Sequence, residues 1–240
     1  MRDSFEGWAL ATIRPIRGVP QSEGIVAANV QRTAVVGVAE HGNSALLVTV
    51  AHGGELLDRR RIDLTTGLPT HPYHHEGAWA VGRYLDSPWA KPIPLPDAIA
   101  LIRRVHEAAE QGAREALEAL AAAVAPAAIA GIAIRVCPTL PATIEERIAD
   151  NRAQVVADSV MYRQALALAA QARGWAVHWY ERERVFKEAA TATGREDVTA
   201  LLAGMGRAAG PPWQAGHKLA AAAALAAGHA VKRARSPAGG

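Results

Sequence analysis

Between residues 34 and 64, the hydrophobic positions form three short runs that turn residues separate. Gly42 and Asn43 stand in the first turn, and Gly53 and Gly54 stand in the second. Runs of this length, divided by glycine and asparagine turns, predict a three-stranded antiparallel meander. The three runs cover residues 35–39, 45–50 and 55–64.

Beyond residue 64 the pattern alternates between helices and strands. Hydrophobic positions three and four residues apart predict a long helix over residues 98–124, which Pro126 ends. Two runs of β-branched or aromatic residues, 131–138 and 175–180, predict strands. Further helices are expected over residues 78–85, 143–173, 181–192, 197–206 and 214–229.

Three features refine this second half. Residues 66–77 contain two prolines and two glycines, and we expect an irregular loop there. Asp150 and Asn151 are expected to divide the helix over residues 143–173. The helix over residues 214–229 is rich in alanine, so it has no bulky side chains to hold it away from a neighbour and can lie close against a sheet.

Strands that alternate with helices after a meander indicate a mixed sheet, because each helical crossover returns the chain in the parallel direction. The sequence therefore predicts an α/β fold with a five-stranded mixed sheet, in which a three-stranded antiparallel meander is followed by parallel strands and helices flank the sheet. We expect this domain over residues 34–229, an irregular arm over residues 1–33 and a disordered basic tail over residues 230–240.

Composition excludes some classes of protein. Half of the 240 residues are hydrophobic, which is ample for a core, and the net charge of +3 allows nucleic acid as a partner without requiring it. Cys137 is the single cysteine, so no intramolecular disulfide or zinc ribbon can form. No stretch reaches the roughly 18 apolar residues of a membrane span. A soluble, cytoplasmic protein without membrane contact is therefore expected.

The order of elements resembles the ribonuclease H-like fold, and the second half resembles its Holliday-junction resolvase branch. That family uses carboxylates at strand ends and on helices to hold two Mg²⁺ ions, which activate water and stabilise the leaving oxygen of a phosphodiester. The resemblance therefore implies a protein that binds or processes nucleic acid. The residues that carry it are 36–44, 171–187, 196–198 and 220–229.

Most of the family's carboxylates have no match in this chain. Glu40 stands at or beside the position of the first acid, but no acid follows the strand over residues 131–138, and the closing helix offers His217 and Lys218 instead. Two hypotheses follow. Either the chain is a metal-dependent phosphodiester hydrolase with an altered site of histidines and carboxylates, or it is a catalytically inactive module that acts in binding or assembly.

For the hydrolase hypothesis, the altered site is expected to combine Glu40 with the residues just past the meander. Glu40, His71, His74 and Glu76 would hold a divalent metal ion, Mn²⁺ or Mg²⁺ before Zn²⁺. His71 and His74 could instead carry protons, and His217 would position the phosphate or act as a general acid. The competing interpretation is that these histidines are solvated or packing residues, with His217 capping or packing its helix.

Other polar features allow a further hypothesis. The turn Gly42, Asn43 and Ser44 could form an anion-binding nest for the phosphate of a small molecule or nucleotide. The arginines at positions 59–61 fit either an edge strand or phosphate contact. Trp175 and Trp179 are expected in the core, with base stacking as the alternative. The partners considered are nucleic acid and a second copy of the chain in a homodimer.

Overall fold

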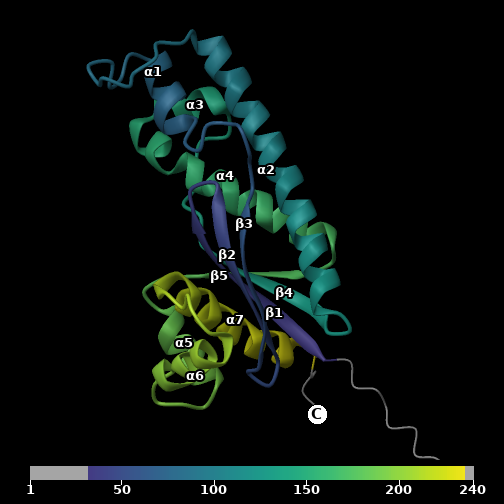
Figure 1. The fold of residues 1–240 in the computed structure, drawn as a ribbon. Coiled ribbons are helices and arrows are strands. Elements are labelled where there is room, and N and C mark those ends of the chain that lie inside the picture. The colour runs from purple at the N-terminus through teal and green to yellow at the C-terminus, as the bar shows by residue number, and fades with distance from the viewer. Residues whose placement is uncertain (1–31, 236–240) are drawn as a thin grey trace, which may run out of the picture. The chain divides into compact units, whose positions relative to one another are not determined.

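The fold is built on one five-stranded sheet (Figure 1), and the computed structural model describes residues 32–235. Its strand order, β3-β2-β1-β4-β5, places the meander beside two strands that run parallel to β1. This confirms the predicted α/β fold with a five-stranded mixed sheet, in which an antiparallel meander is followed by parallel strands. The strands are β1 (Thr33–His41), β2 (Ser44–Ala51), β3 (Leu56–Asp63), β4 (Ala128–Arg135) and β5 (Ala176–Tyr180).

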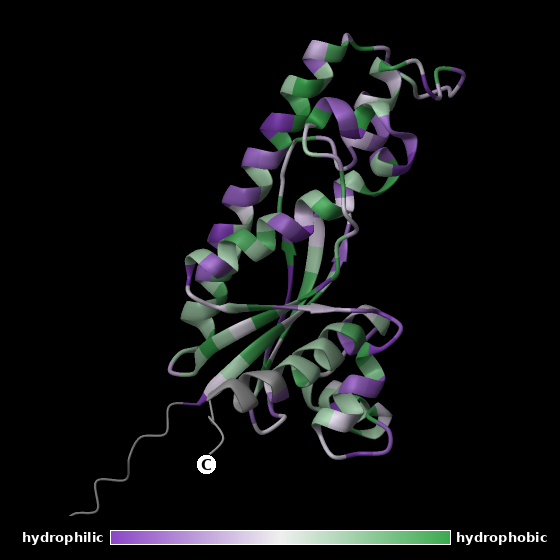
Figure 2. Ribbon diagram, turned by 180° about the vertical axis from the view of Figure 1, so that it is seen from behind, coloured by the Kyte–Doolittle hydropathy of each residue, from purple (hydrophilic) through white to green (hydrophobic). Residues whose placement is uncertain are grey.

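Helices cover both faces of the sheet (Figure 1). One hydrophobic cluster joins the sheet to α2 and α4, and a second joins its opposite face to α5, α6 and α7. In Figure 2, hydrophilic and hydrophobic residues alternate along α2, as expected of a helix with one buried face. The helices are α2 (Leu95–Val124), α3 (Ile144–Ala149), α4 (Asn151–Ala172), α5 (Val185–Ala192), α6 (Thr199–Ala209) and α7 (Ala215–Arg235).

Strand β1 divides its side chains between the two faces. Val36 and Val38 pack in the cluster with α2 and α4, whereas Val35 and Ala39 pack in the cluster with α7. Side chains alternate along a strand, so Glu40 belongs to the same face as Val36 and Val38. This assignment decides which helix the acid can meet.

The alanine-rich helix α7 lies very close to β1, as its sequence predicted. A Cβ atom on Gly37 would lie 1.8 Å from the backbone oxygen of Ala220 and 2.8 Å from the backbone nitrogen of Ala224. Only glycine on the strand and small residues on the helix allow backbones to approach this closely. The contact fixes α7 against the centre of the sheet.

Edge strand β3 carries the three consecutive arginines, and each has a partner within the fold. Arg59 donates from Nη1 to the carbonyl of Gly210 (2.9 Å) and from Nη2 to that of Pro211 (2.9 Å), and it also reaches Pro212. Arg60 pairs with Asp58 and Arg61 pairs with Asp63. These arginines therefore bond to other groups of the fold along the edge strand, as the edge-strand interpretation of the sequence expects.

The irregular loop predicted over residues 66–77 is found over residues 66–72, but the prediction was wrong for residues 73–77, which are helical. A π-helical turn, η1 (Tyr73–Gly77), continues into the short helix α1 (Ala78–Ala80), which replaces the helix expected over residues 78–85. The cause is Asp158 of α4, whose carboxylate accepts hydrogen bonds from the backbone N–H groups of Tyr73 and His74. A cap supplied from so distant a position leaves no local signal.

Two further expectations need correction. Helix α7 continues past His229 to Arg235, so residues 230–235 of the expected disordered tail are helical. Trp175 is buried as predicted, but Trp179 is 47% exposed, so the expectation of a core position was wrong for Trp179. The expected division near Asp150 is confirmed, since its side chain caps α4. The arm predicted for residues 1–33 falls almost entirely outside the described residues.

No helix in residues 32–235 combines the length and the apolar character needed to cross a membrane.

Candidate functional site

Glu40 stands at the carboxyl end of β1 and is held by an arginine of α4. Arg163 donates from Nε to Oε1 of Glu40 over 2.7 Å, its Nη2 contacts the same oxygen, and its Nη1 donates to the carbonyl of Val136 over 2.9 Å. The two side chains are only 8% and 7% exposed. The acid expected to bind a metal ion is thus already paired with a buried guanidinium.

Glu40 and His217 lie on opposite faces of the sheet. The residue at the end of β1 that packs with α7 is Ala39, and His217 belongs to the buried part of α7. The His217 ring stacks on Trp213 with centroids 5.6 Å apart, and its Nδ1 accepts from the backbone N–H of Gln214 over 3.1 Å. Burial lowers its pKa, and nearby Arg59 adds to this effect. His217 therefore makes the packing and capping contacts considered for it.

Four histidines gather where the β1–β2 turn meets η1. The rings of His71 and His75 are 6.0 Å apart, and those of His74 and His75 are 5.4 Å apart. Burial lowers the pKa of His71, and His75, His74 and His41 lower it further because they are near. We call these four residues the histidine cluster. The structure thus brings together His71 and His74, as the sequence suggested, with two more histidines.

Asp158 lies beneath this cluster and was missed from the sequence. Its two carboxylate oxygens each accept from a backbone N–H over 3.0 Å, one from Tyr73 and one from His74. Burial raises its pKa to about 7, and the neighbouring Glu76 acts in the same direction. Oε2 of Glu76 is itself buried and has no hydrogen-bond partner in residues 32–235. The sequence did contain a signal that could have identified Asp158. It is an aspartate four residues after Gln154, on the face of α4 that is buried.

Titration of Asp158 should be visible in the stability of the protein. Its folded pKa of about 7 exceeds the ordinary 3.8, so the folded state binds the proton more tightly. The stability that Asp158 contributes by binding this proton is fully present below pH 3.8 and is lost as the pH rises through 7. Relative to Asp158→Asn, the free energy of unfolding of the natural protein should therefore fall by up to about 4 kcal/mol across that range.

Urea denaturation of both proteins at pH 4 to 8 measures this difference. The histidines whose pKa values are lowered by burial, such as His106 at about 4, favour the folded state as the pH rises, but they are common to both proteins. Parallel pH profiles of the two proteins would contradict the assignment of the titration to Asp158.

The described residues do not fit the metal pair that the family resemblance implies. In residues 32–235, no three side chains of His, Cys, Asp or Glu are grouped so that they could hold a metal ion. Glu40 is engaged by Arg163, and Ala39 offers no ligand toward α7. A shared ion at Glu40, His71, His74 and Glu76 stays a prediction that this geometry does not support.

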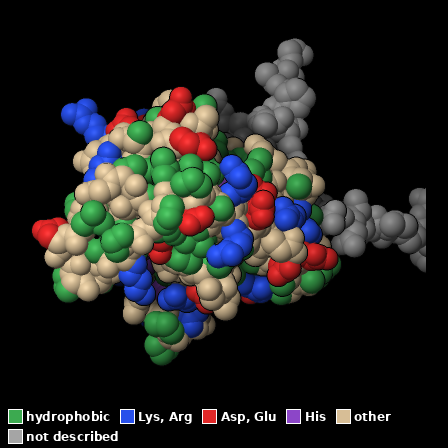
Figure 3. Space-filling view, turned by 90° about the horizontal axis from the view of Figure 1, so that it is seen from above, with side chains coloured by type: hydrophobic (Ala, Val, Ile, Leu, Met, Phe, Trp, Pro, Cys, Tyr) green, Lys and Arg blue, Asp and Glu red, His purple; other side chains and the backbone are tan. Residues whose placement is uncertain are grey.

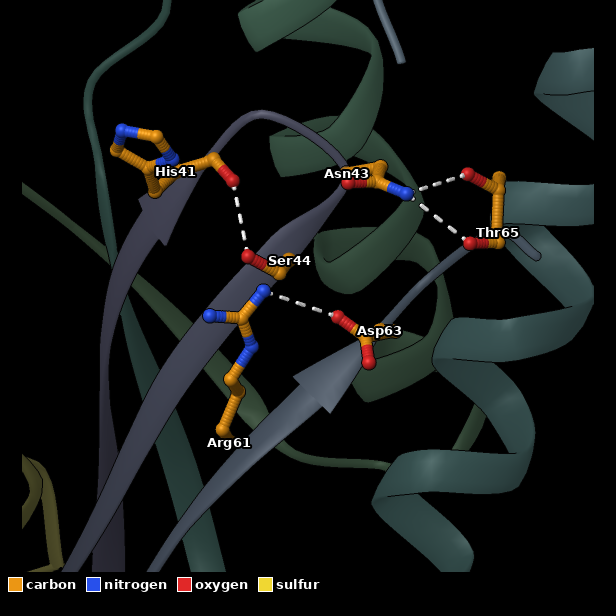
Figure 4. A network of polar contacts seen from close by, with 6 residues as sticks. All are labelled: His41, Asn43, Ser44, Arg61, Asp63 and Thr65. Atoms are coloured by element: carbon orange, nitrogen blue, oxygen red, sulfur yellow. Dashed lines mark hydrogen bonds and ion pairs between the residues drawn. The ribbon is translucent and has the colours of Figure 1, made fainter. Parts of the chain in front are cut away.

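The β1–β2 turn is tied to the end of β3 (Figure 4). Asn43 donates from Nδ2 to the carbonyl and the Oγ1 of Thr65, over 3.0 and 3.2 Å, and Ser44 donates from Oγ to the carbonyl of His41 over 3.0 Å. Gly42 has a φ of 57°, which suits the turn. The side-chain donors of Asn43 and Ser44 are therefore used within the fold, and an anion nest at Gly42, Asn43 and Ser44 stays a prediction.

A hollow of about 440 Å³ lies at the carboxyl ends of β4 and β5, next to the Glu40–Arg163 pair. Arg135, Arg163 and Arg182 line it together with Glu183. Burial raises the pKa of Cys137, also in its wall, so that thiol stays protonated. We call this hollow the arginine pocket. In open α/β sheets, ligands bind at this end of the strands.

Positive charge is local rather than spread over the face shown in Figure 3. On that face, Lys and Arg side chains are interspersed with Asp and Glu side chains. An electrostatic argument for an anionic partner therefore depends on the arginine pocket and not on a broad basic surface there.

Comparison with known proteins gives similarities of fold. No protein-family model matches the chain, and no curated protein matches it. Among solved structures, T. thermophilus RuvC in complex with a Holliday junction substrate is similar at 16% identity and a TM-score of 0.44, over 85% of this chain and 95% of that one. A second Thermus thermophilus RuvC structure is similar at 16% identity and a TM-score of 0.40, over 84% and 95%. At this level, the similarity does not assign a role to any residue.

Proposed function

We propose that this chain is a nucleic-acid-binding module of ribonuclease H-like fold that contacts phosphate through arginines instead of carboxylate-held metal ions. The observation that supports it most is the buried ion pair between Glu40 and Arg163. A guanidinium occupies the place beside the strand acid where the family would hold a cation. This proposal is the second of the two hypotheses from the sequence, that of a catalytically inactive module that acts in binding.

The arginine pocket supplies the contact to phosphate. Arg163 is used by Glu40 and Val136, so the arginines available to a ligand are Arg135 and Arg182. Neither of them forms an ion pair within residues 32–235. Guanidinium groups bind phosphate through paired N–H donors, which suits them to a nucleic-acid backbone.

A second candidate function is phosphodiester hydrolysis at the histidine cluster. The observation that favours it is Asp158, which has a pKa of about 7, accepts a hydrogen bond from the backbone N–H of His74 and lies near Glu76, one of whose oxygens is enclosed without a partner in residues 32–235. Groups that titrate near neutral pH can transfer protons at physiological pH. In this candidate, Glu40 and His217 do not act at the same site, because they lie on opposite faces of the sheet.

Binding of fluorescently labelled DNA, followed by anisotropy at several salt concentrations, tests the first proposal. Single strands, duplexes and four-way junctions serve as ligands. The double variant Arg135→Glu with Arg182→Glu should bind at least about tenfold more weakly and lower the salt slope by about two. The matched control, Arg103→Glu with Arg104→Glu on exposed positions of α2, should bind like the natural protein.

The same DNA, incubated with Mg²⁺ or Mn²⁺, separates the two candidates. The binding module should leave it intact. Cleavage that disappears in His74→Ala but survives in Glu40→Gln would favour the histidine cluster as a hydrolase site. Absence of DNA binding at low salt, or equal loss in the α2 control, would contradict the binding proposal.

A further inference from the structure

A larger cavity, of about 750 Å³, opens on the face of the sheet that α7 covers, beside the edge strand β5. Helices α5 and α7 and strands β4 and β5 enclose it, and it shares no lining residue with the arginine pocket. We call it the β5–α7 cavity. Its volume is within the range of small-molecule sites. Its smooth wall is formed by Ala133, Ala223, Ala226 and Ala227.

His178 of β5 contributes a neutral polar group to this cavity. Its ring lies against Gly131 of β4, where a Cβ atom would be 3.2 Å from Nε2. Nε2 is enclosed without a partner in residues 32–235, whereas Nδ1 is not enclosed and makes no hydrogen bond there. Burial lowers the pKa of His178, so the imidazole is uncharged at neutral pH. Nδ1 is thus the ring atom left to bond a ligand.

The α5 side of the cavity supplies positive charge. Arg184 is engaged by Glu181 (3.4 Å) and Glu188 (3.3 Å), and Glu188 also lines the cavity. Lys187 is exposed and forms no ion pair within residues 32–235. One ammonium group at the edge of the cavity is therefore free to meet an anion.

Trp179 borders the cavity but belongs to the other face of the sheet. Side chains alternate along β5, so Trp179 shares the face of Trp175 and Val177, whereas His178 shares the face of Tyr180, which packs with α7. The flat wall of methyl groups, the neutral imidazole and the free ammonium match the parts of a nucleotide. Apolar and aromatic surfaces accept a base, an imidazole hydrogen-bonds a base or sugar, and an ammonium binds a phosphate.

We propose that the β5–α7 cavity binds a single nucleotide, with the base against the alanine wall and the phosphate at Lys187. This goes beyond the proposed function, because it uses none of the residues of the arginine pocket. The nucleotide could be free in solution or could be the end of a nucleic-acid strand. Both sources present the same base, sugar and phosphate.

Calorimetric titration of the full chain with the four common nucleoside monophosphates tests the site. The natural protein should show one saturable site for at least one of them. Lys187→Gln should weaken binding about tenfold, as expected for loss of one charge-assisted contact. Ala226→Phe, which fills the cavity, should abolish binding. The control Lys91→Gln, at an exposed lysine in a loop, should leave it unchanged.

Circular dichroism during heating shows whether each variant is folded, and the exposed position of Lys187 keeps the test decisive if Ala226→Phe fails to fold. Absence of saturable binding to the natural protein, or equal binding by Lys187→Gln and Lys91→Gln, would overturn the proposal. Competition by a 5′-phosphorylated single strand would identify a strand end as the source, and lack of competition a free nucleotide. Mononucleotide binding should survive in the Arg135→Glu, Arg182→Glu double variant, which separates this site from the proposed function.

Discussion

Arg163→Ala is expected to lower the free energy of unfolding by about 3–5 kcal/mol, because it leaves the carboxylate of Glu40 buried without its partner. Both side chains are more than nine-tenths buried, so solvent screens their attraction little in the natural protein. The carbonyl of Val136 loses a donor as well. Urea denaturation followed by circular dichroism measures the change.

A double-mutant cycle separates the ion pair from the packing of the arginine. Removing both charges with Glu40→Leu and Arg163→Leu should recover part of the loss, since replacing a whole buried pair costs less than breaking it. Arg152→Ala, at an exposed position of the same helix, is the matched control and should change stability by less than about 0.5 kcal/mol. A similarly small effect of Arg163→Ala would show that Glu40 does not depend on this pair.

Gly37→Ala should lower the free energy of unfolding at least as much as Arg163→Ala does. The added methyl group would lie 1.8 Å from the backbone oxygen of Ala220, and no side-chain rotation can relieve a clash with backbone. Helix α7 would have to move away from β1, so we expect a loss of more than about 3 kcal/mol or failure to fold.

Gly53→Ala is the corresponding control. No atom lies within 4 Å of the added methyl group at Gly53, so the same chemical change should alter stability by about 0.5 kcal/mol at most. Thermal unfolding of both variants gives the comparison. Similar melting temperatures for Gly37→Ala and the natural protein would mean that α7 does not approach β1 as described.

The strands could be predicted because their signals are local. Alternation and turn residues marked the meander, and the length of each crossover implied the parallel strands. The helical turn η1 could not be predicted, because its cap, Asp158, comes 85 residues after Tyr73. The exposure of Trp179 could not be predicted either, because the pattern along β5 gives the face of each side chain but not how far the helices cover that face.

The candidate site was predictable only in part, for a related reason. The sequence placed Glu40 at a strand end and several histidines just beyond the meander, and the structure brings His41, His71, His74 and His75 together. The alternation along β1 could have shown that Glu40 shares a face with Val38. It could not show that α4 covers that face, or that α7, with His217, covers the other.

The closeness of α7 to the sheet has a consequence for ligand entry at the β5–α7 cavity. Alanine has no side-chain dihedral angle, so a wall formed by Ala223, Ala226 and Ala227 cannot change its shape by switching rotamers. The backbone contact between Gly37 and Ala220 holds the same helix in place. Any change in the shape of the cavity on ligand binding must then come from α5. The rigid alanine wall loses almost no conformational freedom when the ligand binds.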